Sequence, residues 1–364
     1  MSRLALSPRR AVLGVVAVIL AALVLYIPQY FEEFRVAQFS SVIAISIAVL
    51  GLALLTGFNG QISVGHGAFF GVGAYTTAIL TADHEWGHLS TIPVAMVLCF
   101  LLGVAVGLPA LRISGVYLAL VTLALATLFP LVIQKYSDIT GGSTGIGVPD
   151  FEAPAWAGGM ADDQWAYYVL LTFAVITFVL VRNLVRSRVG RAIIAIRDGE
   201  TAAEVLGVNL AFYKVMTFGI SAMIAGLAGS LFVMNTAVLD RVDPAQYTIT
   251  LSIKFLAALV IGGAATILGP VLGALFIVFV PEYSSEVDAE LSNVIFGGVL
   301  IALMLVLPTG FLGGLRRIEA GILRRLGRDG EWRRAAGPDP RDGPDAEADS
   351  PDPGGSPTVE PAAS

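Results

Sequence analysis

Charged residues are scarce in this sequence of 364 residues. They make up 14% of the chain, and 56% of the residues are hydrophobic; a soluble domain carries about 25% charged residues. The apolar residues form continuous runs near the roughly 20 residues that cross a bilayer as a helix. Because only helices and closed barrels satisfy their backbone in lipid, and the runs do not alternate, the sequence predicts an all-α polytopic membrane protein.

Cysteine and catalytic motifs are also rare or missing. Cys99 is the single cysteine, so no disulfide can form within the chain. The sequence contains no Gly-Lys-Ser/Thr phosphate loop, HExxH, CxxC or GxSxG. The interiors of the long runs lack the carboxylates that an ion-coupled pump usually carries. We therefore expect no catalytic residue, metal site or cofactor in this chain, and an energy source outside it.

Eight of the apolar runs have about the length of a full transmembrane helix. They cover approximately residues 11–28, 36–55, 62–81, 92–111, 113–133, 165–181, 215–239 and 291–307. Another apolar region, 249–281, is broken at Gly262-Gly263 and at Gly269-Pro270, which predicts a hairpin of two short helices. Inverted repeats are common in transporters, and we allow for one here.

Positive charge is distributed unevenly between the loops. With the N-terminus inside, the predicted cytoplasmic segments hold all 22 Lys and Arg residues except Arg35, Lys135, Arg241 and Lys254, which follows the positive-inside rule. This places the N-terminus (1–10), the loop 182–213 and a basic segment (311–334) in the cytoplasm, and the loop 135–164 outside. The transmembrane domain is 11–310. The acidic, Pro- and Gly-rich tail 335–364 is predicted to be disordered, and both termini to be cytoplasmic.

The polar loop 182–213 between two apolar runs contains the stretch GRAIIAIRDGETAAEVLG, residues 190–207. Gly199 interrupts a first short helix, and Thr201 with Glu204 fits a capping box for a second. Gly207 fits the left-handed position that closes a helix, and Asn209 fits the cap of the next. We interpret the segment as a docking element that holds its shape on the membrane surface. A plain structured linker is the alternative, because basic cytoplasmic loops are common.

Polar side chains cluster where the third run begins, in GFNGQISVGHG (57–67). Polar groups within a span are costly and usually face a cavity or a partner, and transporters often bind substrate near interrupted segments in both halves. The candidate substrate path is therefore Asn59, Gln61, Ser63, His66 and Gly67 together with Gly262, Gly263, Gly269 and Pro270. The alternative is helix packing through small residues, with His66 a buried, hydrogen-bonded histidine.

Three stretches resemble the LivM-type permease subunits of branched-chain amino acid ABC importers. They are residues 57–80, 187–232 and 260–276, in the order of the family, and the resemblance covers about 36–315. Thr140-Gly-Gly142 and Gly145 in the outer loop also resemble the family pattern. The tail after Arg334 does not.

The resemblance implies a function and a set of partners. The partners are a second, LivH-like permease, two LivG- and LivF-like ATPase subunits that bind ATP and Mg²⁺, and a solute-binding protein, in a bacterial inner membrane and without nucleic acid. The implied ATPase-coupling residues are Gly190, Arg191, Glu200, Thr201, Ala202, Ala203, Glu204 and Gly207. The expected cargo is leucine, isoleucine or valine. Urea, short-chain amides or other amino acids remain alternatives. A stand-alone channel or carrier, or an enzyme using His66 with Ser63, fits less well.

Overall fold

The computed structural model describes residues 23–110, 116–157, 159–235, 241–287 and 292–306. All of them belong to a unit that ends at Gly314. The predicted N-terminal segment 1–10, part of the first apolar run, the basic segment 311–334 and the tail 335–364 lie outside the described residues.

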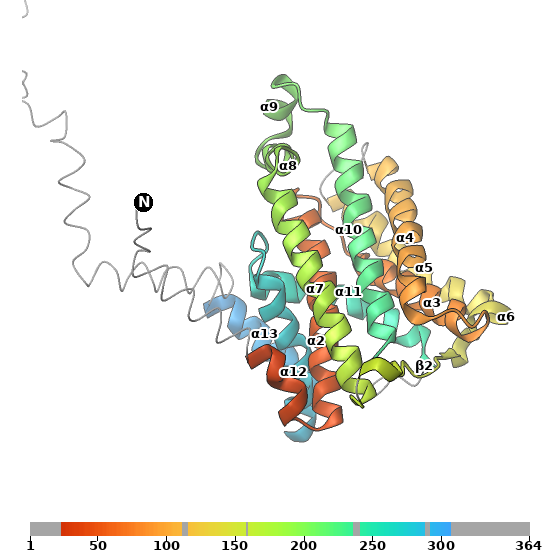
Figure 1. Ribbon diagram of the computed structural model, residues 1–364. Coiled ribbons are helices and arrows are strands. Elements are labelled where there is room, and N and C mark those ends of the chain that lie inside the picture. Colours follow the sequence, from red (N-terminus) through yellow and green to blue (C-terminus); the bar gives the residue numbers. More distant parts are fainter. Residues whose placement is uncertain (1–22, 111–115, 158, 236–240, 288–291, 307–364) are drawn as a thin grey trace, which may run out of the picture. The chain divides into compact units, whose positions relative to one another are not determined.

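Helices make up almost all of the described secondary structure, which confirms the all-α prediction (Figure 1). After a helical stretch at 23–30, the chain forms α2 (Glu33–Leu52) with a π-helical end (Ala53–Phe58), α3 (His66–Ala82), α4 (His88–Ala110), α5 (Val116–Lys135), α6 (Ser137–Thr140), α7 (Asp162–Arg186), α8 (Arg188–Asp198), α9 (Glu200–Val205), α10 (Leu210–Val233), α11 (Ile249–Gly262), α12 (Gly269–Val287) and α13 (Ser292–Val306). Short 3₁₀ turns lie at Gly142–Thr144, Ala155–Ala157 and Pro244–Tyr247.

Five of the described helices are long and apolar enough to cross a bilayer. They are Glu33–Phe58, His88–Pro109, Tyr117–Lys135, Asp162–Arg186 and Leu210–Val233. Helix α3 has 17 residues and α13 has 15, and the apolar parts of α11 and α12 are also short. The described residues therefore do not confirm the predicted count of eight full spans.

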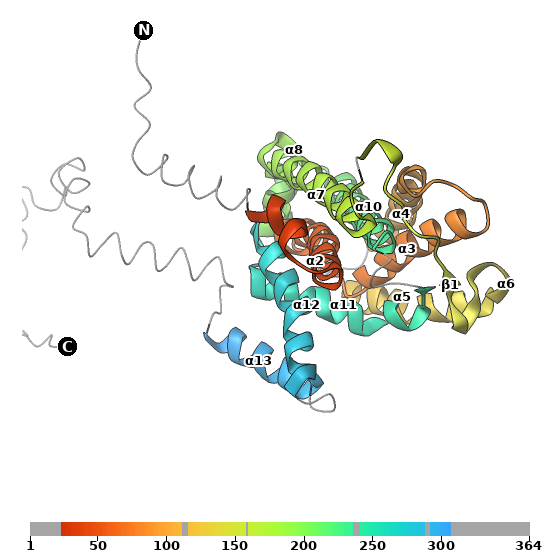
Figure 2. The same cartoon turned by 60° about the horizontal axis from the view of Figure 1, so that its bottom comes forward.

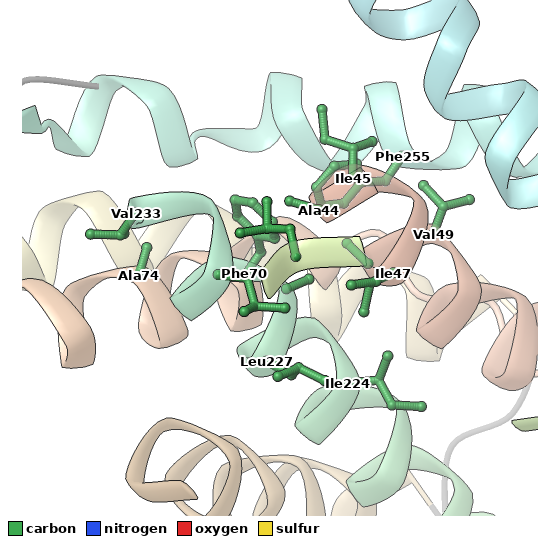
Figure 3. Packing of buried hydrophobic residues seen from close by; sticks show 14 of the residues in the cluster. Ala44, Ile45, Ile47, Val49, Phe70, Ala74, Ile224, Leu227, Val233 and Phe255 are labelled. Atoms are coloured by element: carbon green, nitrogen blue, oxygen red, sulfur yellow. The ribbon is translucent and has the colours of Figure 1, made fainter. Parts of the chain in front are cut away.

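Helix α2 lies at the centre of the packing. It contacts α7, α10, α11 and α12, which surround it in Figure 2. Its buried side chains belong to one cluster with side chains of α3, α10, α11 and further helices, which includes Ile47, Phe70, Ile224 and Phe255 (Figure 3). A helix that is apolar on all sides and buried is expected at the core of a membrane bundle, where neighbours replace lipid.

The predicted hairpin in the last third of the chain is confirmed. Helix α11 ends at Gly262, Gly263 has a φ of 101°, and α12 begins at Gly269 and packs back on α11. We call residues 263–268 the second break. Close approach is possible because a Cβ atom on Gly262 would clash with the backbone of Gly269.

The prediction of a helix over 62–81 is wrong at its start. Residues 59–65, which we call the first break, are not helical, and α3 begins only at His66. Gly60 is left-handed, with a φ of 76°. The backbone N–H of Val64 donates to the Thr122 hydroxyl of α5 at 2.9 Å instead of bonding along a helix. A tertiary partner thus satisfies the backbone where the local sequence does not continue the helix.

The two long loops lie at opposite ends of α7. Figure 1 shows α8 and α9 at one end of α7 and α10, and β2 towards the other end. In the outer loop, β1 (Ile146–Gly147) pairs antiparallel with β2 (Arg241–Val242), and Ile146 faces Val242. With 25 residues, α7 separates the two loops by about 37 Å.

Candidate functional site

The connector, residues 187–209, folds as two short helices. Ser187 caps α8, because its hydroxyl accepts from the Gly190 N–H at 3.3 Å. Ile193 and Ile196 are buried, and α8 packs on α7, α10 and the π-helical end of α2. Helix α8 ends at Asp198, and Gly199 interrupts the chain as predicted. This amphipathic pattern holds α8 against the bundle with its charged side outward.

The predicted capping box of Thr201 and Glu204 is wrong. Helix α9 begins two residues earlier, at Glu200, with Gly199 as its N-cap and no side-chain cap bond. Thr201 therefore lies inside the first turn of the helix. The cause is a distant partner: the Glu200 carboxylate pairs with the Lys214 ammonium of α10 at 2.6 Å, and this draws Glu200 into the helix.

The end of the connector follows the prediction. The N–H of Gly207 donates to the Glu204 carbonyl (2.9 Å) and that of Val208 to the Ala203 carbonyl (3.0 Å). These two bonds define a Schellman closure, which needs a left-handed residue, and Gly207 has a φ of 83°. Asn209 caps α10 by accepting from the Phe212 N–H at 3.0 Å.

The predicted coupling residues lie on one exposed element. All of them except Gly190 and Ala203 are exposed. Beside them, Val205 and Leu206 are 83% and 81% exposed. A groove of about 520 Å³ lies next to them, lined by residues between Glu200 and Lys214. Val205 and Leu206 thus form a small exposed apolar patch at the closed end of α9.

Two polar links that the sequence did not reveal lie around the first break: one joins the connector to the π-helical end of α2, and the other joins the first break to α10. The guanidinium of Arg197 donates from Nη1 to the Gly57 carbonyl at 3.1 Å. The side-chain amide of Gln61 donates to the Lys214 carbonyl at 3.2 Å. The first pair is separated by 140 residues and the second by 153, so no local pattern could have found them.

The candidate path residues in the first break are buried but poorly satisfied. Asn59, Ser63 and His66 are at most 2% exposed. Their polar side-chain atoms make no hydrogen bond with a described residue: both amide atoms of Asn59, the Ser63 hydroxyl and both ring nitrogens of His66. Each such group costs about 1–3 kcal/mol. The Ala48 backbone nevertheless lies near enough to act on the imidazole. His66 is thus buried, as expected from the sequence, with the Ala48 backbone as its polar neighbour.

The two breaks meet. A Cβ atom on Gly57 would clash with the carbonyl oxygen of Ala264 in the second break. The backbone N–H of Gly67 donates to the Ser252 hydroxyl of α11 at 3.0 Å. Gly262, Gly263, Gly269 and Pro270 are all buried in the neck of the hairpin. The structure therefore brings the two predicted groups into one region, although the contacts run through their neighbours.

The site shows no arrangement for covalent chemistry. Ser63 and His66 do not hydrogen-bond to each other, so they do not form the nucleophile–base pair of a serine enzyme. Within the described residues, no group of three His, Cys, Asp or Glu side chains could hold a metal ion. The arrangement provides an exposed, folded connector that lies next to the polar first break between helices.

The comparison with protein families decides the identity. A family model described as "Branched-chain amino acid transport system / permease component" matches residues 34–304. The chain belongs to this permease family. The match covers α2 to α13 apart from their outermost residues. It identifies the chain as a multi-pass membrane protein. The sequence resemblance is confirmed.

Named relatives of this permease agree with the family. The "High-affinity branched-chain amino acid transport system permease protein LivM" of Escherichia coli is 31% identical over 285 residues, covering 72% of this chain and 66% of the relative. The chain thus spans just under two thirds of that relative. The corresponding LivH protein of E. coli is 26% identical over 74% of this chain and 91% of the relative. The BraD permease of Pseudomonas aeruginosa is 25% identical with the same coverage. No solved structure matches the permease.

Proposed function

We propose that this chain is the permease subunit of an ABC importer that takes up branched-chain amino acids. In this proposal the connector docks in a groove of an ATPase subunit, the complex contains two ATPases, a second permease completes the pathway, and a solute-binding protein delivers the cargo. The connector then faces the cytoplasm of a bacterial cell, both chain termini lie on the same side, and the outer loop 135–164 faces the binding protein. The names of the relatives support the cargo, and the names LivM and LivH support a pair of permeases.

The exposed pair Val205 and Leu206 carries the proposal. Their side chains stand on a helix that is closed by Gly207 and fixed by the Glu200–Lys214 ion pair. An ordinary linker would not hold two apolar residues in water in a defined geometry, because exposure of apolar surface costs about 25 cal/mol per Å². A docking element needs this geometry, since a rigid binding surface loses less entropy on association.

The first and second breaks form the inner part of the substrate path in this proposal. The unsatisfied polar atoms of Asn59, Ser63 and His66 are groups that gain hydrogen bonds when a polar solute or water reaches them. An amino acid carries an ammonium and a carboxylate, so it can use both donors and acceptors. Gly262, Gly263, Gly269 and Pro270 would then shape the opposite wall.

Reconstitution tests the proposal. The chain is purified from its native membrane, its partners are identified by mass spectrometry, and the complex is placed in liposomes with its binding protein. We expect two P-loop ATPases and a second permease to copurify, and ATP-dependent uptake of labelled leucine, isoleucine or valine. Uptake of urea or a short-chain amide instead would show that the cargo is not a branched-chain amino acid. Uptake without ATPases would support a carrier and overturn the proposal.

A further inference from the structure

Arg197 occupies a special position at the end of α8. Its Nη1 atom donates to the Gly57 carbonyl at 3.1 Å. Gly57 lies in the last turn of the π-helical end of α2, where the final carbonyls have no partner within the helix. The negative end of the helix dipole favours a cation there. The guanidinium thus supplies both a donor and a charge at the end of the central helix.

The side chain of Arg197 is held in place on two sides. The Asp198 carboxylate accepts from Nε of Arg197 at 2.9 Å and lies 2.9 Å from Nη2. These two contacts fix the orientation of the planar guanidinium group. Its aliphatic stem lies over Gly60, where a Cβ atom would be 3.0 Å from Arg197 Cγ. A lysine could not make the Asp198 and Gly57 contacts together, because its ammonium is a single point charge.

The far side of Gly57 leads to the second break. The Gly57 α-carbon lies against the carbonyl of Ala264, so no side chain intervenes between the two backbones. A second route runs in parallel, from Glu200 to Lys214 and from the Lys214 carbonyl to Gln61. Close-packed interiors transmit displacement with little loss. A movement of the connector therefore reaches both breaks through these side-chain and backbone contacts.

We propose that Arg197 is a positioning residue that clasps the connector to the end of α2, so that the connector and the two breaks move as one unit. This inference rests on the proposed importer function. The Arg197 side chain is 34% exposed, and partly exposed ion pairs contribute little to stability. Removal of Arg197 is therefore expected to leave the fold intact and to impair transmission.

The test uses the assembled transporter in liposomes and measures solute taken up per ATP hydrolysed. We expect Arg197→Met to lower this ratio roughly tenfold, within the 5–150-fold typical of coupling between sites, while ATP hydrolysis continues. Arg186→Met is the matched control, because Arg186 is exposed at the end of α7, outside the connector, and its side chain makes no hydrogen bond or ion pair with a described residue; its ratio should equal that of the wild type. The ratio of solute taken up per ATP for Arg197→Lys should lie between those of the two methionine variants.

A disulfide provides an independent measurement. A Cβ atom on Gly60 would lie 3.5 Å from Arg197 Cβ, within the range of about 3.5–4.5 Å for a disulfide. In a Cys99→Ala background, Gly60→Cys with Arg197→Cys should be uncoupled when reduced and should regain the wild-type ratio when oxidised, because the bond replaces the clasp.

The outcomes separate this inference from the proposed function. A wild-type ratio in Arg197→Met, or a ratio that stays low after oxidation of the cysteine pair, would overturn the clasp and leave the importer function standing. Failure of both Arg197→Met and Arg197→Lys to assemble would also overturn it, since Arg197 would then serve folding. Absence of ATP-driven uptake in the wild-type complex would instead reject the importer function.

Discussion

The carbonyl oxygen of Ala264 lies where a side chain on Gly57 would begin. This contact joins the π-helical end of α2, directly before the first break, to the second break between α11 and α12, far away in the sequence. Neither partner can move sideways without the other, because both surfaces are backbone. The contact therefore sets the spacing between the first and second breaks.

Gly57→Ala is predicted to force these segments apart. Insertion of one methyl group into a packed site costs about 1–3 kcal/mol, so the melting temperature of the purified complex should fall. Gly87→Ala is the control, because nothing lies within 4 Å of a Cβ atom at Gly87. Equal melting temperatures for the two variants would show that the breaks are not in contact.

Gly207→Val is predicted to impair coupling. A φ of 83° costs a β-branched residue about 1–2 kcal/mol or more, so the Schellman closure should open and the connector should lose its shape. Gly199→Ala is the matched control, since Gly199 has an extended φ of 177° and the nearest atom to its Cβ is 3.7 Å away. We expect uptake per ATP to fall only in Gly207→Val. Wild-type transport in that variant at normal protein level would contradict the prediction.

Val205→Ser combined with Leu206→Ser is predicted to weaken ATPase docking without unfolding the chain. Both side chains are more than 80% exposed, so their replacement removes contact area for a partner and no buried packing. The measurement is the amount of ATPase that copurifies. Ile139→Ser is the control, because Ile139 is 57% exposed in α6, in the loop at the other end of α7. Full copurification of the ATPase with the double variant would show that the connector is not part of the docking surface.

Asn59→Leu is predicted to abolish or strongly reduce uptake while the complex still assembles. An apolar residue of similar shape relieves the cost of unpaired buried polar atoms, so stability should be unchanged or higher. Asn235→Leu provides the contrast, because the Asn235 amide donates to the Ala37 carbonyl and the Ser41 hydroxyl, and its loss should reduce assembly. Normal uptake by Asn59→Leu would exclude Asn59 from the substrate path.

Features determined by neighbouring residues could be predicted from the sequence. Gly199, Gly207 and Asn209 are correct because helix interruption, closure and capping depend on a few adjacent residues. The hairpin at 263–268 follows in the same way from its glycines and Pro270. These local rules, together with the apolar runs, were sufficient for the helical architecture and the shape of the connector.

Features determined by distant residues could not be predicted. Thr201 was expected to cap α9, but the Glu200–Lys214 ion pair across 14 residues moves the helix start. The first break was expected to be helical, but the Thr122 hydroxyl, 58 residues from Val64, takes its backbone donor. The Arg197–Gly57 bond has no local signal at all. In each case a tertiary contact outweighs the local preference.

The contact between Gly57 and Ala264 also has a consequence for biosynthesis. The ribosome reaches Ala264 about 200 residues after Gly57, which at about 5–20 residues per second corresponds to roughly 10–40 s. During that interval α2 and α3 are already made, while the hairpin that covers the first break does not yet exist. The newly made α2 and α3 must therefore be accommodated without their contacts to the hairpin until the last third of the chain arrives.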